Sequence, residues 1–124
     1  MTAPAFEELH LMANALQNSG RSSLKIIGDH VAIALDKKSE SERLGYVAKH
    51  FTDLDVKMVR FASEIELARA ADFLDRDKYG ELQVNQETRY AVAAAYRKNA
   101  EQLQQFADVL GRFIQVARQP RGAG

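Results

Sequence analysis

The chain has 124 residues, of which 46% are hydrophobic and 27% are charged, and these are ordinary values for a folded protein. The composition excludes a wholly disordered or fibrous chain. The length predicts a single domain over residues 1–118, followed by a disordered tail at 119–124. Seventeen basic and seventeen acidic residues cancel, so no charge excess marks a nucleic-acid or membrane-surface protein.

Other broad classes are excluded by what the sequence lacks. It contains no cysteine, and therefore no disulfide, thiolate metal site or cysteine nucleophile. No apolar run approaches the roughly 18 residues that a membrane span needs. The first twenty residues lack the basic and then apolar pattern of a signal peptide. We therefore expect a cytoplasmic protein with no membrane partner.

Two helices are predicted in the first third of the chain. Apolar side chains recur at helical spacing from about residue 5 to 18 and from about 23 to 37. The second segment has an alternative, because Gly28 and Asp29 lie between two apolar runs and could form the tight turn of a β-hairpin. We favour the helix, since an isolated hairpin among helices is marginally stable.

A long third segment is predicted over residues 40–75, with Ser39 and Glu42 as a capping box at its start. Its apolar residues alternate three and four apart, which is a heptad pattern. They are Leu44, Val47, Phe51, Leu54, Met58, Phe61, Ile65 and Ala68. Thr52 and Asp53 could instead cap a new helix, so a break near Thr52 is the alternative to one continuous helix.

A fourth helix is predicted over residues 86–118, with Asn85 as its cap, after a polar connector at 76–84. A second heptad pattern follows this helix, and alanines widen the apolar stripe. The pattern consists of Val92, Tyr96, Asn99, Leu103, Phe106, Leu110, Phe113 and Ala117. For Asn99 we expect a buried amide that sets the register or an edge position.

These lengths predict an all-α fold: a helical hairpin or bundle of four to five helices with two long heptad-patterned helices. Unbroken, the two long helices would extend roughly 54 and 50 Å, which is too long for a compact monomer of this size. Either the helix over 40–75 breaks, or part of an apolar face stays uncovered and favours a homodimer. The candidate partner-binding residues on that face are Met58, Phe61, Ile65, Val92 and Tyr96.

The connector resembles the start of an EF-hand calcium loop. Acidic residues, a glycine and an aliphatic residue occupy the first, third, sixth and eighth positions of such a loop, as Asp75, Asp77, Gly80 and Leu82. The resemblance implies weak calcium binding by Asp75 and Asp77. Tyr79 and Gln86 stand where further oxygen ligands are expected, so the alternative interpretation is a polar turn between helices.

Residues 42–62 align loosely with a helix-turn-helix motif whose turn is at Thr52 and Asp53. Lys57 and Arg60 would then be the residues that contact DNA. Against this interpretation, Asp53 and Asp55 at the start of the recognition helix would face the phosphates and repel them. The uninterrupted heptad pattern also favours a bundle helix.

Motifs for catalysis are missing from the sequence. It has neither a glycine-rich phosphate loop nor a nucleophile elbow, and its carboxylates fall mostly opposite the apolar seams. We therefore predict no enzyme, no catalytic residue, no cofactor and no metal ion. The favoured function is a non-enzymatic helical interaction protein, such as an adaptor, chaperone or regulatory subunit. The alternative is a DNA-binding transcriptional regulator.

Overall fold

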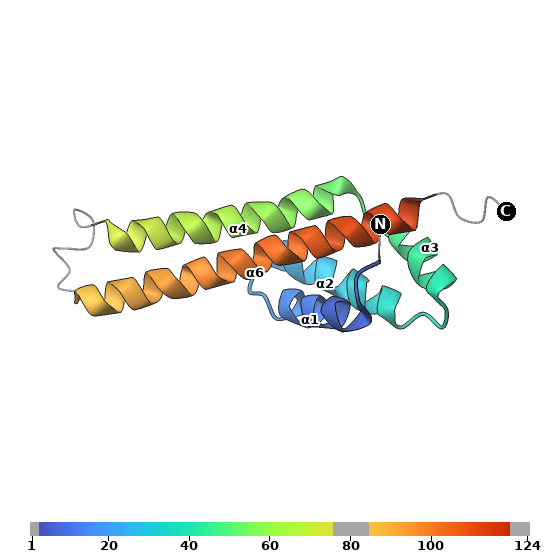
Figure 1. Cartoon of the computed structure of the whole chain (residues 1–124), viewed down its shortest axis with the longest axis horizontal. Helices are drawn as coiled ribbons and strands as arrows, with labels where there is room; N and C mark the ends of the chain where they lie inside the picture. The colour runs from blue at the N-terminus through green and yellow to red at the C-terminus, as the bar shows by residue number, and fades with distance from the viewer. Residues whose placement is uncertain (1–2, 76–84, 120–124) are drawn as a thin grey trace. The chain divides into compact units, whose positions relative to one another are not determined.

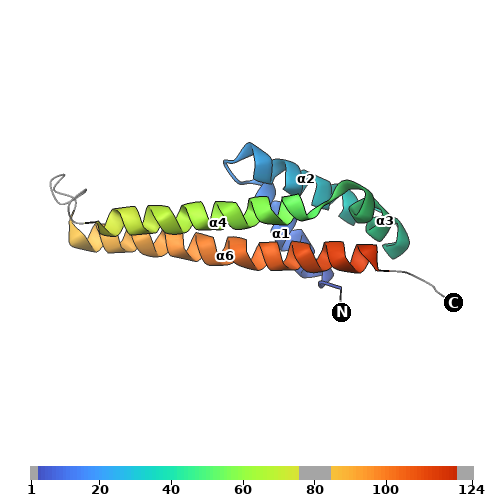
Figure 2. The same ribbon diagram turned by 90° about the horizontal axis from the view of Figure 1, so that it is seen from above.

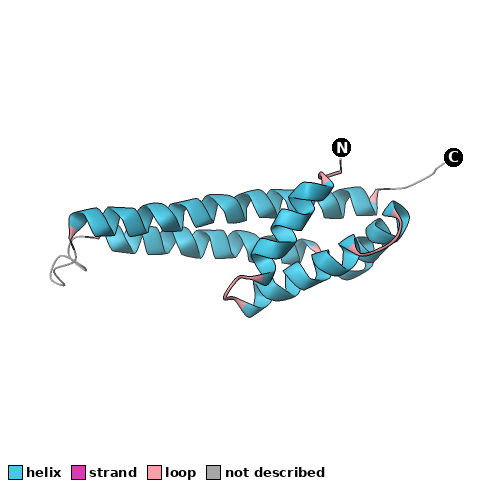
Figure 3. Ribbon diagram, turned by 90° about the horizontal axis from the view of Figure 1, so that it is seen from below, coloured by secondary structure: helices cyan, strands magenta, loops and turns pink. Residues whose placement is uncertain are grey.

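A computed structural model describes residues 3–75 and 85–119. In these residues the regular structure is entirely α-helical, with no strand (Figures 1 and 3). The helices are α1 (Phe6–Gln17), α2 (Ser22–Leu35), α3 (Glu40–His50), α4 (Asp53–Leu74) and α6 (Gln86–Arg118). The predicted all-α fold class is confirmed. The predicted tail, apart from Gln119, and the connector at 76–84 lie outside the described residues.

Three helices end within two residues of their predicted bounds, and these are α1, α2 and α6. The segment around Gly28 is a helix, so the β-hairpin alternative is wrong. Ser39 and Asn85 are confirmed as cap residues, with only the hydroxyl half of the predicted Ser39–Glu42 capping box present. The Ser39 hydroxyl accepts a hydrogen bond from the Glu42 N–H at 3.1 Å, and the Asn85 side-chain oxygen accepts one from the Thr88 N–H at 3.1 Å.

The prediction of one continuous helix over 40–75 is wrong, because the helix is interrupted at Phe51 and Thr52. Phe51 has an extended backbone, with φ −113° and ψ 146°. The Leu54 N–H donates to the Thr52 hydroxyl at 3.2 Å, and the Thr52 N–H donates to the Asp55 carboxylate at 2.8 Å. These reciprocal bonds form a capping box, which satisfies two backbone donors and starts a new helix.

The chain divides into two compact units. The first unit comprises residues 1–58 and 106–124, and the second comprises residues 59–105, so α4 and α6 each contribute to both. In the first unit α1 packs on α2, and α2 on α3. Its buried side chains include large aliphatic and aromatic residues such as Met12, Leu16, Leu24, Val31, Val47, Phe51, Leu110 and Phe113.

Gly28 allows α1 and α2 to approach closely. A β-carbon added at Gly28 would lie 2.7 Å from the Gln17 backbone nitrogen and 2.9 Å from the Leu16 β-carbon. The propensity cost of a glycine in a helix, about 1 kcal/mol, is therefore offset by backbone packing that no side chain allows. On the same helix pair, the Gln17 amide donates to the Asp29 carboxylate at 3.0 Å.

The second unit is an antiparallel pair formed by the adjoining segments of α4 and α6, which lie side by side in both views (Figures 1 and 2). The Ser63 hydroxyl donates to the Ala100 carbonyl at 2.9 Å, and the rings of Phe73 and Tyr96 stack at 5.6 Å. The buried residues are mostly small or polar: Val59, Ala62, Ser63, Glu66, Ala70, Arg89, Ala93 and Ala100.

Candidate interaction surface

Two of the largest apolar side chains of α4 are exposed, whereas most of the residues that it buries are small or polar. The opposite face carries larger apolar side chains, and we name it the α4 stripe: Leu54, Met58, Phe61 and Ile65. Leu54 and Phe61 are 63% and 62% exposed, and Met58 and Ile65 are half-buried.

The break at Thr52 accounts for this exposure. Leu44 and Val47 of the predicted seam are buried on α3, as expected for core positions. Phe51 is extended and neither Phe51 nor Thr52 is helical, so residues beyond the break do not continue the same buried line. The residues predicted as one heptad seam therefore form two separate rows, one on α3 and one on α4. The row on α4 is the α4 stripe.

The five predicted partner-binding residues do not share one environment. Met58, Phe61 and Ile65 lie on the α4 stripe, whereas Val92 and Tyr96 are half-buried on α6. The Tyr96 ring stacks on Phe73, and the Arg69 guanidinium carbon lies 6.0 Å from its centroid, so contacts within the second unit engage this ring. Asn99 is exposed at an edge, as one of its two interpretations expected.

Among the described residues, seven exposed large apolar side chains lie outside the predicted candidate surface: Phe6 and Leu11 on α1, Ile26 and Ile33 on α2, Leu54 and Leu67 on α4, and Tyr90 on α6. Leu54 lies on the α4 stripe, and its place in the heptad pattern was the signal that could have included it. Leu67 and Tyr90, which are 49% and 56% exposed, lie off the predicted seams and carried no such signal.

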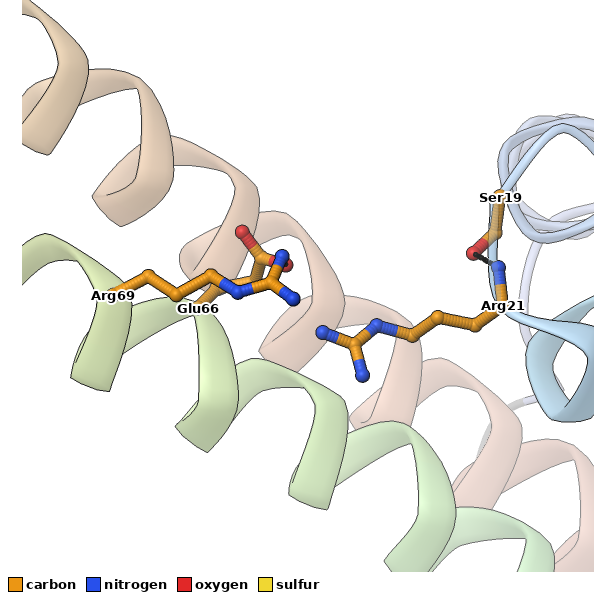
Figure 4. Close-up of polar contacts among 4 residues, drawn as sticks. All are labelled: Ser19, Arg21, Glu66 and Arg69. Carbon is orange, nitrogen blue, oxygen red and sulfur yellow. Dashed lines mark hydrogen bonds and ion pairs between the residues drawn. The ribbon is translucent and has the colours of Figure 1, made fainter.

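Charged residues flank the α4 stripe. Lys57 and Glu64 lie on one flank, seven residues apart, and both are exposed. Over the described residues, neither makes a hydrogen bond or ion pair. Arg69 lies on the other flank and is engaged, since its guanidinium is 3.5 Å from the Glu66 carboxylate (Figure 4).

The two residues proposed as DNA contacts, Lys57 and Arg60, are exposed near the start of α4. The break at Thr52 separates α3 from α4, as a helix-turn-helix motif requires. Asp53 and Asp55 stand in the first turn of the same helix, and Asp55 caps it. The two acidic residues balance the two basic ones, so this segment has no net positive charge.

The structure brings together two of the three histidines. His30 Nδ1 lies 2.8 Å from the Tyr46 hydroxyl, and the His30 and His50 rings are 5.8 Å apart. His10 instead contacts Phe6. Among the described residues, no three histidine, cysteine or acidic residues are grouped to hold a metal. Asp75 is exposed, and its proposed calcium partner Asp77 lies outside the described residues.

A small cavity of about 140 Å³ opens in the first unit beside the start of α1. Leu9, Leu44 and Phe113 line it, and Arg43 stands over the Phe6 ring at 5.5 Å. Pockets for cofactors or drug-sized ligands measure roughly 300–1,000 Å³, so this cavity is too small for such a molecule. In the described part of the chain, no helix is long and apolar enough to span a bilayer.

Comparisons with models of protein families, with curated proteins and with solved structures find no match to this chain.

Proposed function

We propose that this is a non-enzymatic cytoplasmic interaction protein that works as a homodimer and acts by helix–helix packing, as an adaptor, chaperone or regulatory subunit. The observation that carries the proposal is that α4 leaves Leu54 and Phe61 63% and 62% exposed, although most of the residues that it buries are small or polar. Apolar side chains exposed to water are unfavourable, and a contiguous apolar stripe usually marks a contact with another protein.

The spacing of the α4 stripe fits a helical partner. Its residues recur four, three and four positions apart, which is the pattern by which one helix packs along another. The first unit supplies the larger core and the second unit presents most of α4. Under this proposal the stripe contributes binding energy, and the remainder of the chain holds it in helical form.

Light scattering combined with capture from a lysate of the native host, with and without nuclease, tests the proposal. We expect a mass above that of the 13.9 kDa monomer, and a loss of association in Phe61→Ser. Leu67→Ser is the matched control, since Leu67 is exposed on α4 but lies off the stripe. Equal masses and equal capture for all three proteins would refute the proposed function.

The second candidate function is DNA binding through α3 and α4. The capped break at Thr52, with Lys57 and Arg60 exposed beyond it, favours this alternative. It predicts capture that disappears on nuclease treatment and a salt-dependent shift with duplex DNA. Replacing Lys57 and Arg60 by alanine would then weaken DNA binding and leave the mass unchanged.

A further inference from the structure

We infer that a second copy of this chain covers the α4 stripe, with α4 antiparallel to its counterpart and Lys57 paired with Glu64 of that copy. This inference deepens the proposed function by specifying the partner and its orientation, and it rests on that function. Three observations support it: the heptad spacing of the stripe, the opposite charges on one flank, and the engaged arginine on the other.

The spacing assigns each residue of the stripe to a heptad position. Leu54 and Phe61 take the d position, and Met58 and Ile65 take the a position. In an antiparallel pair, a residues meet d residues of the other helix. Met58 then meets Phe61 of the second copy, and Leu54 meets Ile65. A twofold axis repeats both contacts, which gives four apolar layers.

The charges favour the antiparallel orientation. Lys57 and Glu64 both precede an a position, so they lie on the same flank of the stripe. In an antiparallel pair this flank faces the same flank of the other helix, and each lysine therefore meets a glutamate. The twofold axis makes two identical ion pairs from one lysine and one glutamate per chain.

In a parallel pair, Lys57 and Glu64 would not face each other. Such a pair would place Lys57 opposite Ala62 and Glu64 opposite Arg69 of the other copy. Arg69 is already 3.5 Å from Glu66 and over the ring of Tyr96 in its own chain. The lysine would then have no acidic partner on the facing flank, and the arginine would have to leave its own contacts.

Cysteine cross-linking tests the orientation, because the chain has no cysteine of its own. In the antiparallel register, Leu54 lies opposite Ile65 of the second copy, and the two Leu54 positions are about 17 Å apart along the helix axis. A disulfide needs α-carbons within about 7 Å. A mixture of Leu54→Cys and Ile65→Cys should therefore form a mixed disulfide, whereas neither variant alone should form a dimer disulfide.

The outcomes separate this inference from the proposed function. A dimer disulfide in Leu54→Cys alone would show a parallel pair and overturn the inference. A dimer by light scattering without the mixed disulfide would place the contact elsewhere, with the proposed homodimer intact. A monomeric mass would overturn both the inference and the homodimer in the proposed function, and capture of partners through Phe61 would then decide the remaining interaction function separately.

Charge reversal tests the ion pairs. K57E sets carboxylates against each other at both symmetric positions, and E64K does the same with ammonium groups. We expect each to raise the dimer dissociation constant about tenfold, since each variant replaces two favourable ion pairs by two repulsions. The double variant K57E/E64K should restore the constant, and K98E, an exposed lysine on α6, is the control. An unchanged constant for K57E would overturn the pairing.

Discussion

The two units of the molecule bury different kinds of side chain. The first unit encloses Met12, Leu16, Leu110 and other large residues, with the tight backbone contact at Gly28 between α1 and α2. The second unit buries alanines together with Ser63, Glu66 and Arg89, and it leaves Phe61 62% exposed. The difference lies in what the two units bury, because both also expose large apolar residues, such as Leu11 and Ile26 in the first unit and Phe61 and Tyr90 in the second.

The hydrophobic effect explains why this difference matters. Burial contributes roughly 25 cal/mol per Å² of apolar surface, so large side chains in the first unit contribute most of the stability. An alanine contributes little because it removes little surface from water. Apolar surface that the second unit leaves in water does not stabilise the folded chain, and burying it against another molecule would be favourable.

The largest expected effect tests the core of the first unit. Leu110→Ala should lower the free energy of unfolding by about 3 kcal/mol, since Leu110 is fully buried and its truncation leaves a cavity. Phe61→Ala is the counterpart in the second unit and should cost less than about 0.5 kcal/mol once the chain is monomeric. Urea unfolding over a dilution series measures both. A large cost for Phe61→Ala at low protein concentration would break the comparison.

The next effect tests how tightly the first unit is packed. Gly28→Ala should destabilise the protein by about 1–3 kcal/mol, because the added methyl group meets backbone and side-chain atoms closer than 3.0 Å. Gly111→Ala, with nothing within 4 Å, is the matched control. It should stabilise α6 by about 0.5–1 kcal/mol. Thermal unfolding should show a lower melting temperature for Gly28→Ala and a higher one for Gly111→Ala. Equal shifts in melting temperature would contradict the close packing at Gly28.

The smallest effect compares helix caps in the two units. Thr52→Ala removes the hydroxyl cap of α4 in the first unit and should lower the free energy of unfolding by about 1 kcal/mol. Asn85→Ala removes the cap of α6 in the second unit. Its effect should be local fraying, seen as faster hydrogen exchange over the first turn of α6 with little change in urea unfolding. A similar loss of global stability in both variants would refute the contrast.

Helix positions could be predicted from apolar spacing and caps, but burial could not. Val92 and Leu103 lie on the predicted heptad seam of α6 and are half-buried, whereas Ala93 and Ala100, predicted only to widen that stripe, are buried in the second unit. Spacing shows which residues share a face. It does not show which face meets a neighbour, because that depends on residues distant in sequence.

The error over residues 40–75 has a local cause. The heptad pattern passed through Phe51 without interruption, so periodicity alone favoured one helix. The capping signal at Thr52 and Asp53 was also present. A new helix starts there because Thr52 and Asp55, rather than Asp53, satisfy two backbone donors with their side chains. Gly28 is a different case. The cost of a glycine in a helix was evident from the sequence, but the reason for a glycine at this position lies in its packing against α1.

The continuity of α4 and α6 through both units has a consequence for helix formation itself. Starting a helix is costly, whereas extending an existing one adds a hydrogen bond for each residue ordered. Contacts of the first unit fix one end of each of these helices, so the segments in the second unit need only propagate. They can therefore remain helical over a thin core.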